Sequence, residues 1–244
     1  VRRDPFNVAA WEDLGHVLGA QSSLEEAEQC LRVALRLSAS RHHAWNMLGQ
    51  VLGARGDRGG AEHALRTAAR LQPEDAAAWQ QLAALMLGDG RGEQAMPMLL
   101  HVVRLSSSPS TALKLLGDAH ALRGDHDAAE RWYLRAVAAA EDNVDALNEL
   151  GVLYIQQRGR EHEAETVFRR ALELNARSGA LHESSAVNVA AMAEARGELH
   201  TAEQLLRQVC AADDKSIVAR VHLAQVLLRS QRYAEADALL RPLG

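Results

Sequence analysis

Residues Asp145 to Asn175 read DALNELGVLYIQQRGREHEAETVFRRALELN, and this stretch decides the fold. Apolar and small residues recur at helical spacing on both sides of a turn at Arg158 to Arg160, which predicts two amphipathic helices of about three turns each. The residues on these two helix faces are Leu147, Leu150, Gly151 and Tyr154, followed by Ala164, Phe168, Ala171 and Leu172. The stretch therefore predicts a pair of helices that pack through small residues.

The Leu150-Gly151 pair has counterparts toward the start of the chain, at a fixed period of about 34 residues. These counterparts are Leu116-Gly117, Leu82-Ala83, Leu48-Gly49 and Leu14-Gly15. A fixed period of this length is the sequence signature of a helix-turn-helix solenoid. The small residue of each pair lets the partner helix approach closely. We therefore expect an all-α chain built from repeated helix pairs.

A larger pattern surrounds the Leu-Gly pair. It reads W-x-x-L-G, then A-x-x-x-(F/Y/L)-x-x-A, then often P, with Trp11, Trp45 and Trp79 at the first position and Pro73 at the last. This pattern resembles the tetratricopeptide repeat, and the resemblance covers the whole chain. It implies a right-handed α-α superhelix whose first helices form a concave groove for a protein or peptide partner.

We expect about seven repeats in a single solenoid over residues 1–244. Their approximate bounds are 8–41, 42–75, 76–109, 110–143, 144–178, 183–216 and 217–244, and residues 1–7 read as the end of a preceding repeat. The last repeat is not followed by a polar capping helix, which solenoid ends usually need. Further repeats, an assembly partner or self-association are therefore expected at the open ends.

The period changes once, between the fifth and sixth repeats. The step from Gly151 to Ala190 is longer than the repeat period, because one extra residue lies in the turn of the fifth repeat and four lie between Ala176 and Ser185. Four residues are about one helical turn. We expect the helix over about residues 179–196 to be longer than its siblings or to begin with an extra turn.

Composition excludes several classes of partner. The formal net charge of −5 disfavours a broad attraction to nucleic acid or to an anionic membrane. No apolar run reaches the length of a membrane span, so we expect no membrane insertion and a cytoplasmic location. Cys30 and Cys210 lie in different repeats without ligand spacing, and both are interpreted as reduced, partly buried helix residues.

No catalytic, metal or cofactor motif is found. The glycine-rich stretches at 53–60 and 88–93 lack the lysine of a phosphate-binding loop and follow no expected strand, so we interpret both as turns. The chain has 11 histidines, but none forms a helical pair beside a carboxylate at metal-ligand spacing. We expect no enzymatic activity, no cofactor and no metal.

Arginines recur near the ends of the expected second helices. Arg36, Arg70 and Arg104 share the repeat period, and Arg32, Arg66, Arg169 and Arg207 lie in related places. Cations near helix C-termini interact favourably with the helix dipole, by about 0.3 to 1 kcal/mol each, and this accounts for the arginines without a partner. The alternative is a basic stripe on the convex side that binds an acidic partner.

The concave groove supplies the predicted partner site. The resemblance implies that positions three before and one after the small residue face the groove, together with polar neighbours. The predicted site residues are Glu12, His16, His43, Asn46, Gln50, Gln80, Gln81, Lys114, Asp118, Asp145, Asn148, Glu149 and Gln156. Acidic residues are in excess around the fourth and fifth repeats, so the expected ligand has basic or amide character.

These observations favour a non-catalytic module or adaptor that binds a peptide or partner protein in the groove, within a larger protein or complex. One alternative is the substrate-recruiting or regulatory arm of an enzyme, such as a glycosyltransferase, whose catalytic domain lies outside this chain. Another is a self-assembling repeat protein.

Overall fold

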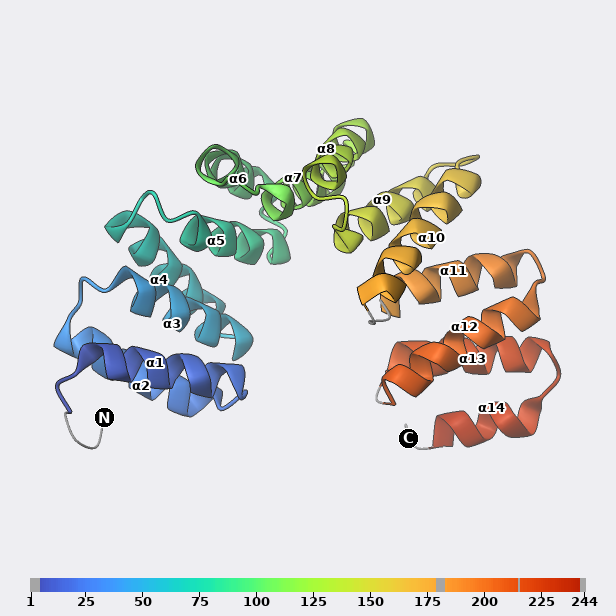
Figure 1. The fold of residues 1–244 in the computed structure, drawn as a ribbon, viewed down its shortest axis with the longest axis horizontal. Helices are drawn as coiled ribbons and strands as arrows, with labels where there is room; N and C mark the ends of the chain where they lie inside the picture. Colours follow the sequence, from blue (N-terminus) through green and yellow to red (C-terminus); the bar gives the residue numbers. More distant parts are fainter. Residues whose placement is uncertain (1–4, 179–182, 215, 242–244) are drawn as a thin grey trace. The chain divides into compact units, whose positions relative to one another are not determined.

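The computed structural model describes residues 5–178, 183–214 and 216–241, and these residues form fourteen helices and no strand (Figure 1). The predicted all-α fold of repeated helix pairs is confirmed. The first helices of the pairs are α1 (Val8–Ala20), α3 (His42–Ala54), α5 (Ala76–Gly88), α7 (Ser110–Leu122), α9 (Val144–Gln156), α11 (Glu183–Ala195) and α13 (Ile217–Arg229). The second helices are α2 (Leu24–Leu37), α4 (Arg58–Leu71), α6 (Gly92–Leu105), α8 (His126–Ala139), α10 (Glu161–Ser178), α12 (Leu199–Ala212) and α14 (Tyr233–Leu240).

The helices form two compact units, Val1–Trp132 and Tyr133–Gly244, called unit 1 and unit 2. The boundary between the units lies inside α8. From α1 to α7 in unit 1, and from α9 to α14 in unit 2, each helix packs against the next one along the chain. This neighbour-to-neighbour packing is typical of a solenoid.

The small residue of the Leu-Gly pair marks the closest contact inside a helix pair. A Cβ atom built on Gly15 would lie 2.8 Å from Leu31 Cγ, and one on Gly49 would lie 2.5 Å from Leu65 Cγ. On Gly151 it would lie 2.6 Å from two carbon atoms of the Phe168 ring. Glycine at this position therefore provides the space that the large residue of the second helix fills.

The turns inside the helix pairs share one left-handed residue. Five are glycines, namely Gly56, Gly90, Gly124, Gly159 and Gly197, with φ between +73° and +85°. The first and last pairs use Ser22 (φ 61°) and Gln231 (φ 60°) in place of glycine. Because glycine adopts this conformation without a steric penalty, the glycine-rich stretches are turns, as predicted.

Three tryptophans join the first helices to the turns before them. The indole nitrogens of Trp11, Trp45 and Trp79 donate hydrogen bonds to the carbonyls of Pro5, Ala39 and Pro73, at 2.8, 2.9 and 2.9 Å. Each acceptor lies six residues before its donor. The bond satisfies the polar atom of a large apolar side chain and fixes the entry of the chain into the next helix pair.

Ion pairs connect successive second helices. In each case a glutamate of one second helix pairs with the arginine four residues later and with an arginine at or just before the start of the next second helix. We call this set the Glu–Arg ladder: Glu28 with Arg32 and Arg55, Glu62 with Arg66 and Arg91, Glu165 with Arg169 and Arg196, and Glu203 with Arg207 and Arg232. The four related arginines of the predicted basic stripe are therefore partly neutralised.

The second helix of the fifth repeat is longer than the other complete second helices. Helix α10 has 18 residues, whereas α2, α4, α6, α8 and α12 have 14. Helix α11 is described over Glu183–Ala195. The predicted start near Gly179 lies outside the described residues. Four inserted residues thus lengthen the second helix of the fifth repeat.

Candidate partner-binding site

The first helices of neighbouring repeats form a common face in each unit. Helix α1 contacts α3, α3 contacts α5 and α5 contacts α7 in unit 1, and α11 contacts α13 in unit 2. We call this surface the first-helix face. It is the face on which the sequence places the predicted groove.

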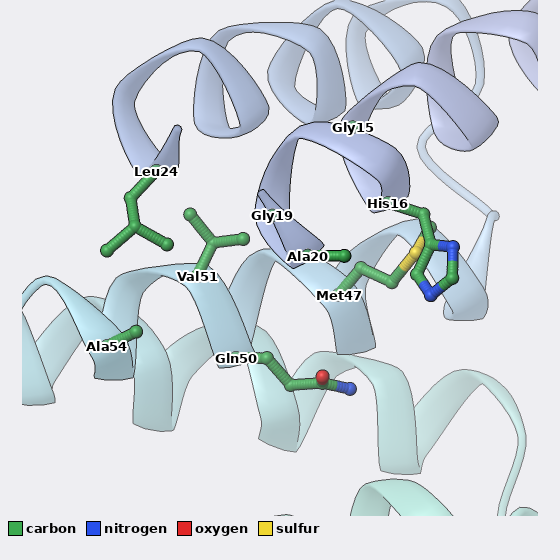
Figure 2. Close-up of a pocket in the computed structure, with 9 residues that line it drawn as sticks. All are labelled: Gly15, His16, Gly19, Ala20, Leu24, Met47, Gln50, Val51 and Ala54. Atoms are coloured by element: carbon green, nitrogen blue, oxygen red, sulfur yellow. The ribbon is translucent and has the colours of Figure 1, made fainter. Parts of the chain in front are cut away.

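A pocket of about 430 Å³ opens on the first-helix face of unit 1, and we call it the His16 pocket (Figure 2). Helix α1 contributes Gly15, His16, Gly19 and Ala20, α2 contributes Leu24, and α3 contributes Met47, Gln50, Val51 and Ala54. Figure 2 shows the His16 ring beside Met47, and Gln50 extending from α3. Two predicted site residues, His16 and Gln50, thus line one pocket.

Glycine shapes the floor of the His16 pocket. A Cβ atom on Gly19 would lie 3.6 Å from Val51 Cγ2, which is ordinary contact, so a side chain there would occupy the space of the pocket. Val51 is buried, whereas His16 and Gln50 are exposed. The pocket therefore combines an apolar floor with a rim that offers an imidazole and an amide, both able to donate and to accept hydrogen bonds.

A second pocket of about 500 Å³ lies in unit 2, and we call it the Ile155 pocket. It is lined by Ile155 of α9, by Glu161, His162 and Glu165 of α10, by Asn188, Ala191, Met192 and Ala195 of α11, and by Arg196 after it. Ile155 keeps 45% of its surface exposed. An exposed aliphatic side chain beside carboxylates favours a ligand with both apolar and hydrogen-bonding groups.

The two pockets occupy the same place in their repeats. When Gly15 is aligned with Gly151 and Gly49 with Ala190, five lining residues of one pocket correspond to five of the other. Gly19, Met47, Gln50, Val51 and Ala54 correspond to Ile155, Asn188, Ala191, Met192 and Ala195. The two pockets therefore share a register between consecutive first helices, and the Ile155 pocket is also lined by the start of α10.

Three predicted site residues are buried. Glu12 and Asn46 are 5% exposed, and Asn148 is 7% exposed. Both carboxylate oxygens of Glu12 accept hydrogen bonds from Arg41, and Asn148 Oδ1 accepts one from Asn188 Nδ2 at 3.1 Å. At these three residues the position three before the small residue is buried, and Asn148 is covered by a residue of the next repeat.

The other predicted residues are accessible to different degrees. His43, Asp145 and Gln156 are exposed, and Gln80, Gln81, Lys114, Asp118 and Glu149 are half-buried. Lys114 and Asp118 form an ion pair of 2.9 Å on one face of α7, which reduces the charge that either offers to a ligand. Apart from His16 and Gln50, none of the predicted residues lines either pocket.

The apolar side chains of the site were not among the predicted residues. Met47, Val51, Ile155 and Met192 line the pockets, although apolar residues in a helical pattern are usually assigned to the core. One signal was present in the sequence. Gly19 and Gly53 follow Gly15 and Gly49 by one helical turn, and a second glycine at that spacing leaves surface space beside the packed one.

The pKa shifts in and near the pockets are caused by burial and by neighbouring side chains. Burial opposes ionisation of Glu165, but hydrogen bonds from Arg169 and Arg196 outweigh it and hold the pKa of this carboxyl below its usual value. Burial raises the pKa of the Cys30 and Cys210 thiols. Across residues 5–178, 183–214 and 216–241, no group of three histidine, cysteine or acidic side chains could hold a metal ion.

Within the described part of the chain, no helix combines the length and the apolar character needed to cross a membrane.

Comparisons with known proteins support the repeat architecture. Two family models, both described as tetratricopeptide repeat, match the chain, one over residues 46–99 and 82–144 and the other over 144–178. A search of curated protein sequences finds no match.

Several solved structures share the fold. PilW, a widely conserved type IV pilus biogenesis factor, is 19% identical with a TM-score of 0.74, over 90% of this chain and 98% of PilW. PilF of Pseudomonas aeruginosa is 18% identical with a TM-score of 0.68, over 89% of this chain and 97% of PilF. YrrB, a TPR protein with an unusual peptide-binding site, is 19% identical with a TM-score of 0.57, over 75% and 92%. At these identities the likeness shows the fold.

Proposed function

Because the chain belongs to the tetratricopeptide repeat family, we propose that it is a protein-interaction module that holds a peptide segment on the first-helix face. The observation that carries this proposal is the recurrence of one pocket, at the same place in the repeat, in both units. A single pocket is common on any protein, whereas a pocket repeated along a solenoid suits an extended chain. The peptide-binding site described for YrrB, which shares the fold, gives further support.

The pocket chemistry defines the kind of segment. In the His16 pocket, Val51 and Leu24 accept an apolar side chain, while His16 and Gln50 hydrogen-bond to backbone or side-chain amides. In the Ile155 pocket, Ile155 and Met192 supply the apolar surface. We therefore expect a ligand with spaced apolar side chains and free amide groups. A basic side chain on the ligand would face Glu161, which is exposed in the lining of the Ile155 pocket.

The test is affinity capture from the source lysate with three versions of the chain as bait, followed by direct binding of the purified prey. The first bait is unchanged, the second carries His16→Ala and Gln50→Ala, and the third carries Gln29→Ala and Gln72→Ala. Gln29 and Gln72 are exposed and line neither pocket, so the third bait is a matched control.

We expect a prey that is captured by the first and third baits and lost from the second. The purified prey should bind the His16 and Gln50 variant about tenfold more weakly, which corresponds to about 1.4 kcal/mol. Equal affinity of the prey for all three baits would reject the His16 pocket as the site. Replacing Ile155 with Asn tests the second pocket in the same assay.

A further inference from the structure

Two pockets on the opposite side of unit 1 carry arginine and tryptophan. The Trp45 pocket, of about 470 Å³, lies between α2 and α4, and the Trp79 pocket, of about 560 Å³, lies between α4 and α6. The residues that correspond at the repeat period are Arg32 and Arg66, Arg36 and Arg70, and Trp45 and Trp79. His63 borders both pockets. These pockets are distinct from those on the first-helix face.

The positive charge in these pockets is available to a ligand. Arg36 makes no ion pair or hydrogen bond within the described part of the chain, and Arg70 bonds only to the Thr67 hydroxyl, at 3.3 Å. The acids nearby are engaged elsewhere. Asp57 accepts a hydrogen bond from the Gly60 backbone N–H at the start of α4, and Glu62 pairs within the Glu–Arg ladder.

The pockets also offer apolar surface. Trp45, Trp79 and Met98 are their partly exposed apolar side chains, and the buried Leu48, Leu52 and Leu82 lie beside them. The Trp45 indole meets the His63 ring edge to face, with the ring centroids 6.0 Å apart. A guanidinium beside an aromatic ring and leucines matches an acidic side chain that is next to an apolar one.

The helix dipole alone does not account for these arginines. Helices α8 and α12 are 14 residues long, as α2 and α4 are. At the position of Arg36, however, they carry Ala138 and Ala211. A cation would interact as favourably with the C-terminus of those helices. Within the second helices, arginine occupies this position in α2, α4 and α6 of unit 1.

Unit 2 contains the same pocket without these features. Its counterpart, of about 280 Å³, lies between α10 and α12 and keeps Arg169 in the place of Arg32. Glu173 stands in the place of Arg36, and Ala186 in the place of Trp45. The unit 2 pocket therefore keeps the arginine of the Glu–Arg ladder but lacks both the second arginine and the indole of the unit 1 pockets.

We propose that the second-helix side of unit 1 binds a segment of a partner protein in which acidic residues alternate with leucine or aromatic residues. Its carboxylates pair with Arg36 and Arg70, and its apolar side chains enter the Trp45 and Trp79 pockets. Arg104, exposed at the corresponding place in α6, extends the cationic row. The site is independent of the peptide proposed for the first-helix face.

The probes are short fluorescein-labelled peptides, read by fluorescence polarisation. In the first peptide, pairs of glutamate residues alternate with single leucine or phenylalanine residues. The second peptide has lysine in place of each glutamate. The third has serine in place of each leucine and phenylalanine. An oligothymidylate strand of equal charge is the fourth probe. The chain is compared with an Arg36→Glu/Arg70→Glu variant and with a milder Arg36→Gln/Arg70→Gln variant, and circular dichroism verifies that both are folded.

The acidic apolar peptide should bind tightest, and its affinity should fall about tenfold or more in the Glu variant and less in the Gln variant. Raising the salt concentration from about 0.05 to about 0.5 M should weaken it. A His16→Ala/Gln50→Ala variant should bind this peptide normally, which separates the outcome from that of the first-helix face. No binding of the acidic apolar peptide, equal binding of the oligothymidylate, or unchanged affinity in both arginine variants would overturn the proposal.

Discussion

At the scale of single residues, the packing of the helix pairs depends on glycines, which have no side chain. Gly151 allows the Phe168 ring to lie where a Cβ atom would otherwise be, and Gly15 and Gly49 do the same for leucines. Phe168 is fully buried, and the ring is held between helices α9 and α10 of one pair. Adding one methyl group at such a position therefore disturbs the packing of both helices of the pair.

Replacing Gly151 with Ala should lower the free energy of unfolding by about 1 to 3 kcal/mol, and Leu should cost more, because the new Cβ overlaps the Phe168 ring. Urea denaturation measures the change. Gly59→Ala is the control, since the nearest atom to its built Cβ is 4.0 Å away and its position in α4 favours alanine. Equal stability of the Gly151→Ala protein and the unchanged chain would contradict this packing.

Gln231 holds a conformation that glycine adopts more readily. Its φ of 60° matches the turns at Gly159 and Gly197 of unit 2. Gln231→Gly should therefore stabilise the last helix pair by about 0.5 to 1 kcal/mol, and Gly197→Ala should destabilise its own turn by a similar amount. Thermal denaturation followed by circular dichroism would show both shifts. A lower melting temperature for Gln231→Gly would mean that its side chain contributes more than the backbone strain costs.

Asn148 stabilises the fold through the neighbouring repeat. Its Oδ1 accepts the hydrogen bond of Asn188 Nδ2, and Asn188 lines the Ile155 pocket. Asn148→Ala should cost about 1 to 3 kcal/mol by leaving a half-buried amide without this acceptor. A double-mutant cycle with Asn188→Ala measures the coupling, and strictly additive losses would show that the bond contributes nothing.

At the scale of elements, the Glu–Arg ladder connects one helix pair to the next. Each glutamate meets one arginine on its own helix and one from the following repeat, so the same carboxylate supports a helix and an interface. Pairs of this kind are partly exposed, and each is worth little by itself. Their effect is therefore expected in the dependence of stability on pH and salt.

The hydrogen bonds from Arg91 hold the pKa of Glu62 below its usual value of 4.5. A carboxyl whose pKa is lower in the folded state than in the unfolded state stabilises the fold above about pH 4.5, and this contribution is lost as the pH falls through the lower value. Glu62→Gln should therefore cost about 0.5 to 1 kcal/mol near neutral pH and much less in acid. Urea denaturation at about pH 7 and about pH 3 compares the two proteins. A cost that stays the same at both pH values would argue against the ion pair.

The length of α10 could not be predicted from the repeat period. Four extra residues between Ala176 and Ser185 could lengthen either flanking helix, and the predicted start of the following helix lies outside the described residues. The stretch from Ala164 to Ser178 contains no glycine or proline, so nothing in it ends the helix. Helix α10 therefore continues to Ser178, about one turn longer than α2, α4, α6, α8 and α12.

At the scale of the whole molecule, the repeat period predicted the helix pairs because each repeat packs mainly against its neighbours. The site was less predictable. His16 and Gln50 could be found from their register, but Glu12, Asn46 and Asn148 share a register position that is buried in the structure. Whether a position is open depends on the size of the side chains across the interface, and one repeat considered alone does not contain that information.

The net charge of −5 describes the average of the chain and not its surfaces. Arg36 and Arg70 give the second-helix side of unit 1 a cationic character, whereas Glu173 stands at the corresponding place in unit 2. Charges separated by more than about 10 Å are largely screened at moderate salt, so a ligand responds to the local set. An acidic chain can therefore bind an acidic segment at one of its faces.

The division into two units leads to a last prediction. A fragment of residues 1–139 contains unit 1 and ends with α8, so it keeps every helix that lines the His16, Trp45 and Trp79 pockets. Because solenoid repeats contact mainly their neighbours, the fragment should fold with helical circular dichroism and a lower melting temperature than the full chain. Its affinity for the acidic apolar peptide should stay within about twofold of that of the full chain, while a ligand of the Ile155 pocket should be lost. An unfolded fragment would show that unit 1 depends on unit 2, and a folded fragment that fails to bind the peptide would place the acidic site elsewhere.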